Sequence, residues 1–381
     1  MRFGLFLPAG QWPGQSPADA LRRTVTLARA AEDAGFDEVW LAEHHFMTYG
    51  VCPSATVLAG HLLAATSRIA VGTAVAVLSA RHPVALAEEA ALLASLAPGR
   101  FLLGIGRGGP WRELEVLGTG LDRYDHAFPE SLDLLLTCLT PTEPQESPER
   151  GHNTRAHDGG RADADARESA EHGPDARAWG GGRAVAAEGR FFRFREVPFV
   201  PVPEVAPPVF LACTSPASEE LAARRGLPML LGMHVGDAEK AEAIARYRAL
   251  GGPREVGHVA TGLAWVGRSR AEAQKTVRAE LPRWMGPGLA GYVAVDGRPR
   301  QQRDAAAYAA ELAEMHAVGD ADDCTAALER ACAVPGVERV VLLAECAADP
   351  RRVLENVRSL GRDVLPRLRV PVSSRAGAAA G

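Results

Sequence analysis

Short apolar runs alternate with longer segments of helical periodicity along most of the chain. The run from Phe3 to Leu7 is apolar throughout and ends at Pro8, which is typical of a buried strand followed by a loop. The alternation predicts strands at 3–7, 38–42, 69–77, 101–105, 208–212, 227–232, 258–266 and 337–343. It predicts helices at 17–34, 54–66, 84–96, 125–139, 216–225, 237–250 and 350–362, with two or three more between 269 and 333.

This order of elements predicts the fold class. About eight strands that alternate with helices favour a single (β/α)8 TIM barrel over residues 1–372, and 381 residues suffice for one such barrel. An open, doubly wound sheet is the alternative. That fold requires a glycine-rich turn after its first strand, and the sequence Pro-Ala-Gly-Gln-Trp at 8–12 is not one.

Three segments interrupt the alternation. Residues 141–188 contain no Leu, Ile, Met or Phe, so we expect a disordered insertion between strands 4 and 5. The tail 373–381 is also expected to be disordered. Residues 281–304 are rich in Gly and Pro and follow the seventh strand, which places a lid-like insertion at the face of the barrel where active sites form.

Charge and cysteine spacing exclude several kinds of partner. The net charge is −5 with no basic stripe, so no nucleic acid is expected. No uncharged stretch is long enough to span a membrane, and the first apolar run is too short for a signal peptide, so we expect a cytoplasmic protein. The six cysteines are scattered without the spacing of a zinc site, and no metal is expected.

Polar residues that follow barrel strands converge on one mouth and form a candidate site. They are Glu43, His44, His45, His82, Arg107, Thr214, Ser215, Ser218 and His234. His44 and His45 are adjacent, so they point to opposite faces and are not expected to share a metal ion. A purely structural role at the barrel rim is the alternative for this pair.

Two of these strand ends suit an anion. Arg107 is followed by two glycines, which lets a phosphate approach both the guanidinium and the backbone. Thr214 to Ser218 opens a helix, where hydroxyls and free amides meet at the positive end of the helix dipole. The alternative for Ser215 and Ser218 is an ordinary helix cap. Together the two sites indicate a phosphorylated cofactor.

Several motifs in this order resemble the luciferase-like flavin monooxygenases. They include AGFDEVWLAEHHF at 34–46, IAVGT at 69–73, GIGR at 104–107, ARRGLP at 223–228 and VGDADDC at 318–324. The resemblance covers nearly the whole chain apart from the insertion and the tail. It implies a (β/α)8 barrel that takes reduced FMN from a separate NAD(P)H-dependent flavin reductase, reacts with O2 through a C4a-(hydro)peroxyflavin, and oxygenates an unidentified organic substrate.

The resemblance also implies roles for individual residues. His44 is the catalytic histidine, with Glu43 and His45 beside it. The implied cofactor-binding residues are Arg107, Ser215, Ser218, Gly106, Thr214, Ala74 and Val75, the last two at a non-prolyl cis peptide. The implied substrate-pocket residues are His82, Trp284, Trp111 and His234, and the segment after Trp284 corresponds to a mobile loop.

One position departs from the family pattern. Gly106 stands where luciferases carry a reactive cysteine, so we expect a substrate other than a long-chain aldehyde. Two alternatives remain for the function. One is hydride transfer with the deazaflavin F420, and the other is a catalytically silent subunit similar to luciferase beta, which the presence of both His44 and Arg107 argues against. A homodimer is expected through the small residues of helix 54–66, although these also suit close packing on the chain's own barrel.

Overall fold

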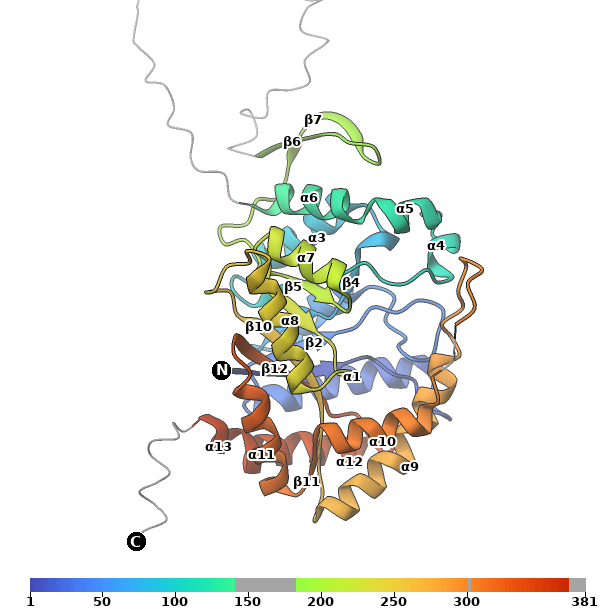
Figure 1. Cartoon of the computed structure of the whole chain (residues 1–381), viewed down its shortest axis with the longest axis vertical. Coiled ribbons are helices and arrows are strands. Elements are labelled where there is room, and N and C mark those ends of the chain that lie inside the picture. Colours follow the sequence, from blue (N-terminus) through green and yellow to red (C-terminus); the bar gives the residue numbers. More distant parts are fainter. Residues whose placement is uncertain (141–182, 301–302, 370–381) are drawn as a thin grey trace, which may run out of the picture.

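The computed structural model describes residues 1–140, 183–300 and 303–369. Within this part of the chain, eight parallel strands close into a barrel that helices surround (Figure 1). The last strand pairs with the first in parallel, with Leu5 opposite Leu342, and this pairing closes the ring. Around the ring the strands are β1 (Arg2–Leu7), β2 (Glu38–Leu41), β3 (Ala70–Thr73), β5 (Phe101–Gly106), β8 (Val209–Cys213), β9 (Met229–Leu231), β10 (His258–Val266) and β12 (Val337–Leu343). The predicted TIM barrel is confirmed.

The remaining strands and the helices are connections or coverings. Short strands β4 (Ala76–Val77) and β11 (Ala317–Gly319) pair with β5 and β10. The helices are α1 (Pro17–Asp33), α2 (Ala55–Ala65), α3 (Pro83–Leu96), α4 (Glu113–Val116), α5 (Gly120–His126), α6 (Phe128–Leu139), α7 (Pro216–Arg224), α8 (Asp237–Ala249), α9 (Arg270–Leu289), α10 (Ala305–Met315), α11 (Ala321–Cys332), α12 (Pro350–Ser359) and α13 (Leu365–Arg369). Among the described residues, no helix is both long and apolar enough to cross a membrane.

Trp40 on β2 fills the interior of the barrel. Its ring is fully buried and meets Phe210 of β8 edge to face, with ring centres 5.2 Å apart. Glycines on neighbouring strands make room for it, because a Cβ at Gly72 would lie 2.6 Å from the indole and one at Gly4 would lie 2.9 Å away. The indole Nε1 donates to Glu38 at 2.9 Å. Trp40 and Phe210 therefore fill part of the space that these strands enclose.

A buried ion pair joins the first and last βα connections. Arg23 on α1 donates to Glu345, which follows β12, at 2.8 Å, and both side chains are almost completely buried. Arg23 also donates to the carbonyl of Gly10 in the loop after β1. The pair therefore links the loops at both sides of the β1–β12 seam, near the barrel mouth.

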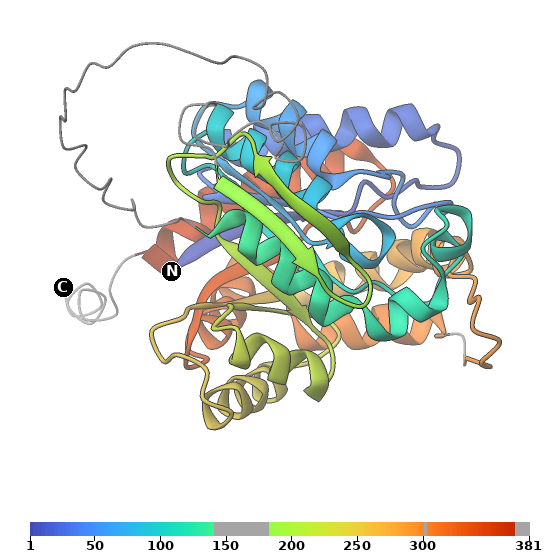
Figure 2. The same cartoon turned by 90° about the horizontal axis from the view of Figure 1, so that it is seen from above.

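The last part of the predicted disordered insertion, residues 183–188, is instead ordered. Residues Arg183–Glu188 are β6, which pairs with β7 (Arg193–Phe199) in an antiparallel hairpin that lies across α6 (Figure 2). The Glu130 carboxylate on α6 accepts the backbone amides of Arg190, Phe191 and Phe192, which anchors the hairpin turn. Residues 141–182 and the tail from 370 lie outside the described residues.

Two other predictions need correction. Helix 125–139 is in fact two helices, α5 and α6, which meet at Ala127. The lid-like insertion was expected from residue 281, but residues 281–289 continue α9 despite Pro282 and Pro287. The irregular loop therefore begins only after Leu289. Its mobility stays a prediction.

Candidate active site

A cavity of about 480 Å³ lies at the carboxyl ends of the barrel strands. This size falls within the range of ligand pockets. Eight of the residues predicted from the sequence line it: Glu43, His44, His45, Ala74, Val75, Trp111, Thr214 and His234. They follow β2, β3, β5, β8 and β9, so the barrel topology brings together side chains that are far apart in the sequence.

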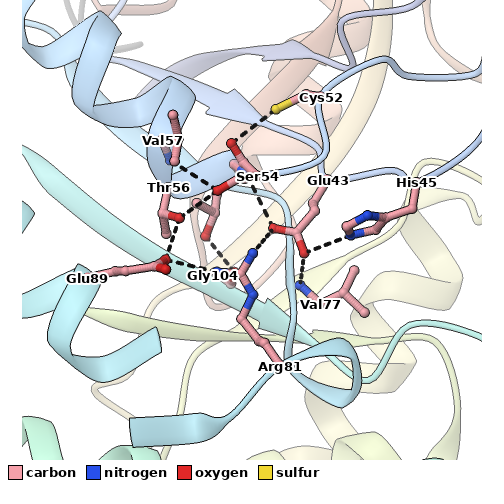
Figure 3. Close-up of polar contacts among 12 residues, drawn as sticks. Glu43, His45, Cys52, Ser54, Thr56, Val57, Val77, Arg81, Glu89 and Gly104 are labelled. Atoms are coloured by element: carbon pink, nitrogen blue, oxygen red, sulfur yellow. Dashed lines mark hydrogen bonds and ion pairs between the residues drawn. The ribbon is translucent and has the colours of Figure 1, made fainter. Parts of the chain in front are cut away.

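Glu43 organises the wall of the cavity at the end of β2 (Figure 3). Its carboxylate is buried, and it accepts the backbone amides of Ala55 and Val77 at 3.3 and 3.2 Å. It also accepts from the Arg81 guanidinium at 3.1 Å, and Arg81 in turn contacts Glu89 at 2.8 Å. Such a buried carboxylate is stable only because charge and hydrogen bonds compensate its lost hydration.

His45 lies next to this carboxylate. Its Nε2 is 3.5 Å from a Glu43 oxygen, which is close enough for an ion pair when the ring is protonated. This contact is not a hydrogen bond, and Nε2 has no hydrogen-bond partner among the described residues. Glu43 therefore supports His45 through charge and position.

His44 points into an aromatic part of the cavity. Its ring meets Tyr49 and Tyr292 edge to face, with centres 5.2 and 6.2 Å apart. Its Nδ1 has no hydrogen-bond partner among the described residues, and it lies so close to Gly50 that a Cβ there would be 2.5 Å away. Loss of hydration lowers the pKa of His44 to about 4, which the negative charge of Glu43 only partly offsets. The ring is therefore neutral near pH 7.

The peptide between Ala74 and Val75 is cis, as the resemblance implied. Both residues line the cavity after β3. Gly106 lies behind Val75, because a Cβ at Gly106 would be 2.7 Å from a Val75 methyl group. Any residue larger than glycine at 106 therefore requires Val75 to move, which gives a physical reason for the absence of a cysteine here.

The predicted anion-binding residues lie at the rim. The parallel register of Ile105 with Leu211 places the ends of β5 and β8 side by side, so Arg107 and Thr214 follow neighbouring strands. Arg107 is exposed, with its guanidinium 4.5 Å from the centre of the Tyr124 ring. Ser215 and Ser218 form a reciprocal capping box at the start of α7, with hydroxyl oxygens 3.1 Å apart. The two serines cap the helix and also stand at its positive end.

His82 and Trp284 do not line the cavity. His82 is exposed at the start of α3, where its Nδ1 accepts the amide of Val84. Trp284 is buried in α9, where it stacks on Tyr49 at 4.7 Å and donates to the Tyr49 carbonyl at 3.2 Å. Trp284 therefore supports Tyr49, a residue of the cavity wall, from behind.

The loop after α9 covers one side of the cavity. Its backbone is hydrogen-bonded to residues 110–112. The Arg112 amide donates to the Val293 carbonyl at 3.0 Å, and the Val295 amide donates to the Pro110 carbonyl at 2.9 Å. Tyr292 reaches into the cavity and packs against Trp111, with ring centres 5.1 Å apart. Tyr292 therefore forms part of the cavity wall beside His44.

Sequence reasoning missed other residues of the cavity wall, among them Tyr49, Glu113, Thr261 and Tyr308. Glu113 lies on the connection after β5, so its place at the carboxyl face was a usable signal. Tyr308 lies on α10 and comes close only through the packing of α10 on α9, which no local pattern reveals.

Comparison with known proteins gives a consistent match. The family model described as luciferase-like monooxygenase matches residues 1–339. The alkanal monooxygenase alpha chain of Photorhabdus luminescens is 30% identical over 260 residues, which are 68% of this chain and 60% of the relative. The chain thus spans about three fifths of the length of this relative and of the alkanal monooxygenase alpha chain of a Kryptophanaron alfredi symbiont.

Solved structures show the same fold. Monooxygenase RslO1 from Streptomyces bottropensis is 21% identical with a TM-score of 0.73, covering 97% of this chain and 100% of that one. The oxygenating constituent of 3,6-diketocamphane monooxygenase from Pseudomonas putida, solved in complex with FMN, is 17% identical with a TM-score of 0.67, covering 97% and 99%.

We predict that the His44 ring stays uncharged from pH 8 down to about pH 5. The folded chain binds this proton near pH 4, whereas the unfolded chain binds it near pH 6.5, so His44 destabilises the fold as the pH falls between those values. The ¹³C NMR signals of the histidine rings, with His44→Asn to assign them, measure its midpoint. A midpoint near 6.5 would contradict the proposed environment.

Proposed function

Because the chain belongs to the luciferase-like monooxygenase family, we propose that it is a two-component monooxygenase that uses reduced FMN and O2 to oxygenate an organic substrate. In this proposal a separate NAD(P)H-dependent reductase supplies the flavin. The observation that carries the proposal is one cavity that joins His44, the Ala74–Val75 cis peptide and the ends of β5 and β8.

The residues present fit this cofactor. Gly108 and Gly109 line the cavity without side chains that would block a ring, and His44 has a buried nitrogen without a partner among the described residues. At the rim, Arg107, Thr214 and the start of α7 would hold the phosphate. When bound, reduced FMN supplies the two electrons that activate O2, so that one oxygen atom enters the substrate and the other leaves as water.

The chain's own residues would orient the reactants and manage protons. The neutral His44 ring accepts a hydrogen bond at one nitrogen and donates one from the other, so it would orient a flavin or substrate group and relay a proton without becoming charged itself. Arg81 compensates the charge of Glu43, so His45 and His44 stay in place beside it. Tyr292 and Trp111, which pack against each other, would shield part of a bound ring from water.

We also propose that two copies associate through α2 and α3. Ala55 and Ala59 on α2 are fully buried against the chain's own barrel, so these small residues do not provide the contact. The neighbouring surface instead exposes Val57, Leu92 and Leu96, with Leu96 75% exposed. Apolar side chains grouped on two adjacent helices favour a contact that removes them from water.

The function is tested by loading the full chain with reduced FMN without oxygen and then admitting air with a panel of aldehydes, ketones and phenols. We expect an oxygenated product that carries one ¹⁸O atom from ¹⁸O2. Release of hydrogen peroxide without any product would contradict the proposal. Anaerobic hydride transfer from reduced F420 would favour the alternative enzyme class.

The phosphate site is tested by Arg107→Ala. Because hydrogen bonds between charged groups contribute about 1.5–3 kcal/mol, the Kd of reduced FMN should rise roughly tenfold or more. Reduced riboflavin has no phosphate, so its Kd should change much less. Arg112→Ala removes an exposed arginine of the same connection and serves as the control. An equal loss for both flavins would contradict a phosphate contact at Arg107.

Leu96→Asp tests the association. Sedimentation should show the wild-type chain at twice the monomer mass and this variant at the monomer mass, because a buried carboxylate opposes the contact. Leu250→Asp, which replaces another exposed leucine at the end of α8, should remain a dimer. A wild-type monomer, or a dimeric Leu96→Asp, would rule out this surface.

A further inference from the structure

The cavity contains a second buried carboxyl, Glu113. It is not part of the hydrogen-bond network of Glu43. Glu113 begins α4 and lines the cavity, and only 5% of its surface is exposed. Its Oε2 is shielded from solvent and has no hydrogen-bond partner among the residues the structure describes. Glu43, by contrast, receives two backbone amides and a guanidinium. The two carboxyls of this cavity thus have opposite environments.

The environment of Glu113 favours its neutral form. No arginine or lysine of the described residues forms an ion pair with it, whereas Glu43 has Arg81. Burial raises the pKa of the Glu113 carboxyl, and neither its own backbone amide nor the nearby His45 offsets that effect. A carboxyl oxygen accepts a hydrogen bond from a hydroxyl group in either protonation state, and the protonated form can also donate one to a carbonyl group.

The surroundings of Glu113 are mostly aromatic and apolar. Trp111 precedes it by two residues, and Tyr292, which packs against Trp111, also lines the cavity with Tyr49 and Tyr308. Aromatic rings offer flat apolar contacts to a planar ligand and little polar recognition. Glu113 therefore adds an unpartnered carboxyl oxygen beside these rings, in addition to the unpartnered nitrogens of His44 and His45.

We propose that Glu113 is the substrate-recognition residue of this cavity, and that the substrate is an uncharged, mainly aromatic compound that presents a hydroxyl or carbonyl group to it. The inference rests on the proposed function, because it names the substrate class of the same site. A substrate of this class supplies the hydrogen bond that the folded chain leaves unmade, and a buried polar group without a partner is costly.

Equilibrium dialysis of the full chain against four naphthalene probes tests this. The probes are 2-naphthol, 2-methylnaphthalene, 2-naphthoate and naphthalen-2-ylmethylammonium, which share a ring system and differ in the attached group. We expect 2-naphthol to bind about fivefold to tenfold more tightly than 2-methylnaphthalene, as one satisfied hydrogen bond provides. Neither charged probe should bind more tightly than 2-naphthol.

Variants then assign the preference to Glu113. Glu113→Leu should bind 2-naphthol and 2-methylnaphthalene equally, whereas Glu113→Gln should keep most of the preference because an amide also donates and accepts. Glu115→Gln, on an exposed position of the same helix, should behave as the wild type. If Glu113→Leu does not fold, Glu113→Ala takes its place, with the same expected loss of the preference for 2-naphthol.

Three outcomes would overturn the proposal. In the first, the wild type binds 2-naphthol no more tightly than 2-methylnaphthalene. In the second, the wild type binds the ammonium probe more tightly than 2-naphthol. In the third, Glu113→Leu still binds 2-naphthol more tightly than 2-methylnaphthalene. The dialysis uses no flavin, so its result is separate from the proposed function. If the chain fails to bind reduced FMN while the 2-naphthol preference holds, only the cofactor assignment is wrong.

Discussion

The contact on which the site depends most is the hydrogen bonding of the Glu43 carboxylate. This one group accepts the amide of Ala55 at the start of α2, the amide of Val77 in β4 and the guanidinium of Arg81 before α3. It therefore fixes the connection after β2 to the connection after β3. An ion left alone in such a place costs several kcal/mol, so each partner is needed to keep the others in position. His44 and His45, the next residues in the chain, take their positions from this arrangement.

The barrel provides a closed base for that arrangement. Trp40 occupies the interior because Gly4 and Gly72 leave space for its ring, and its indole is fully buried there. The cavity above it has an aromatic side near His44, with Tyr49 and Tyr292, and a polar rim where Arg107 and α7 stand. This division suits a ligand with a flat ring system at one end and an anionic group at the other.

Much of this could be predicted from the sequence, because barrel strands and the residues after them obey local rules. Apolar runs located the strands, and the rule that strand ends converge identified Glu43, His44, Arg107 and Thr214. Tertiary packing decided the rest. Tyr308 reaches the cavity from α10, and Trp284 packs behind Tyr49 because α9 continues through Pro282. The hairpin of β6 and β7 escaped prediction because its contacts are distant in the sequence, with Glu130 on α6 anchoring its turn and Phe192 and Phe199 buried in the core.

We propose that one cavity holds a reduced flavin, with its phosphate at the rim and its ring beside His44. A crystal structure of the chain with reduced FMN, grown without oxygen, measures this directly. We predict that the phosphate lies within hydrogen-bonding distance of Arg107 and the start of α7. The ring should lie against Ala74, Val75 and His44. A phosphate bound elsewhere, or a ring outside the cavity, would contradict it.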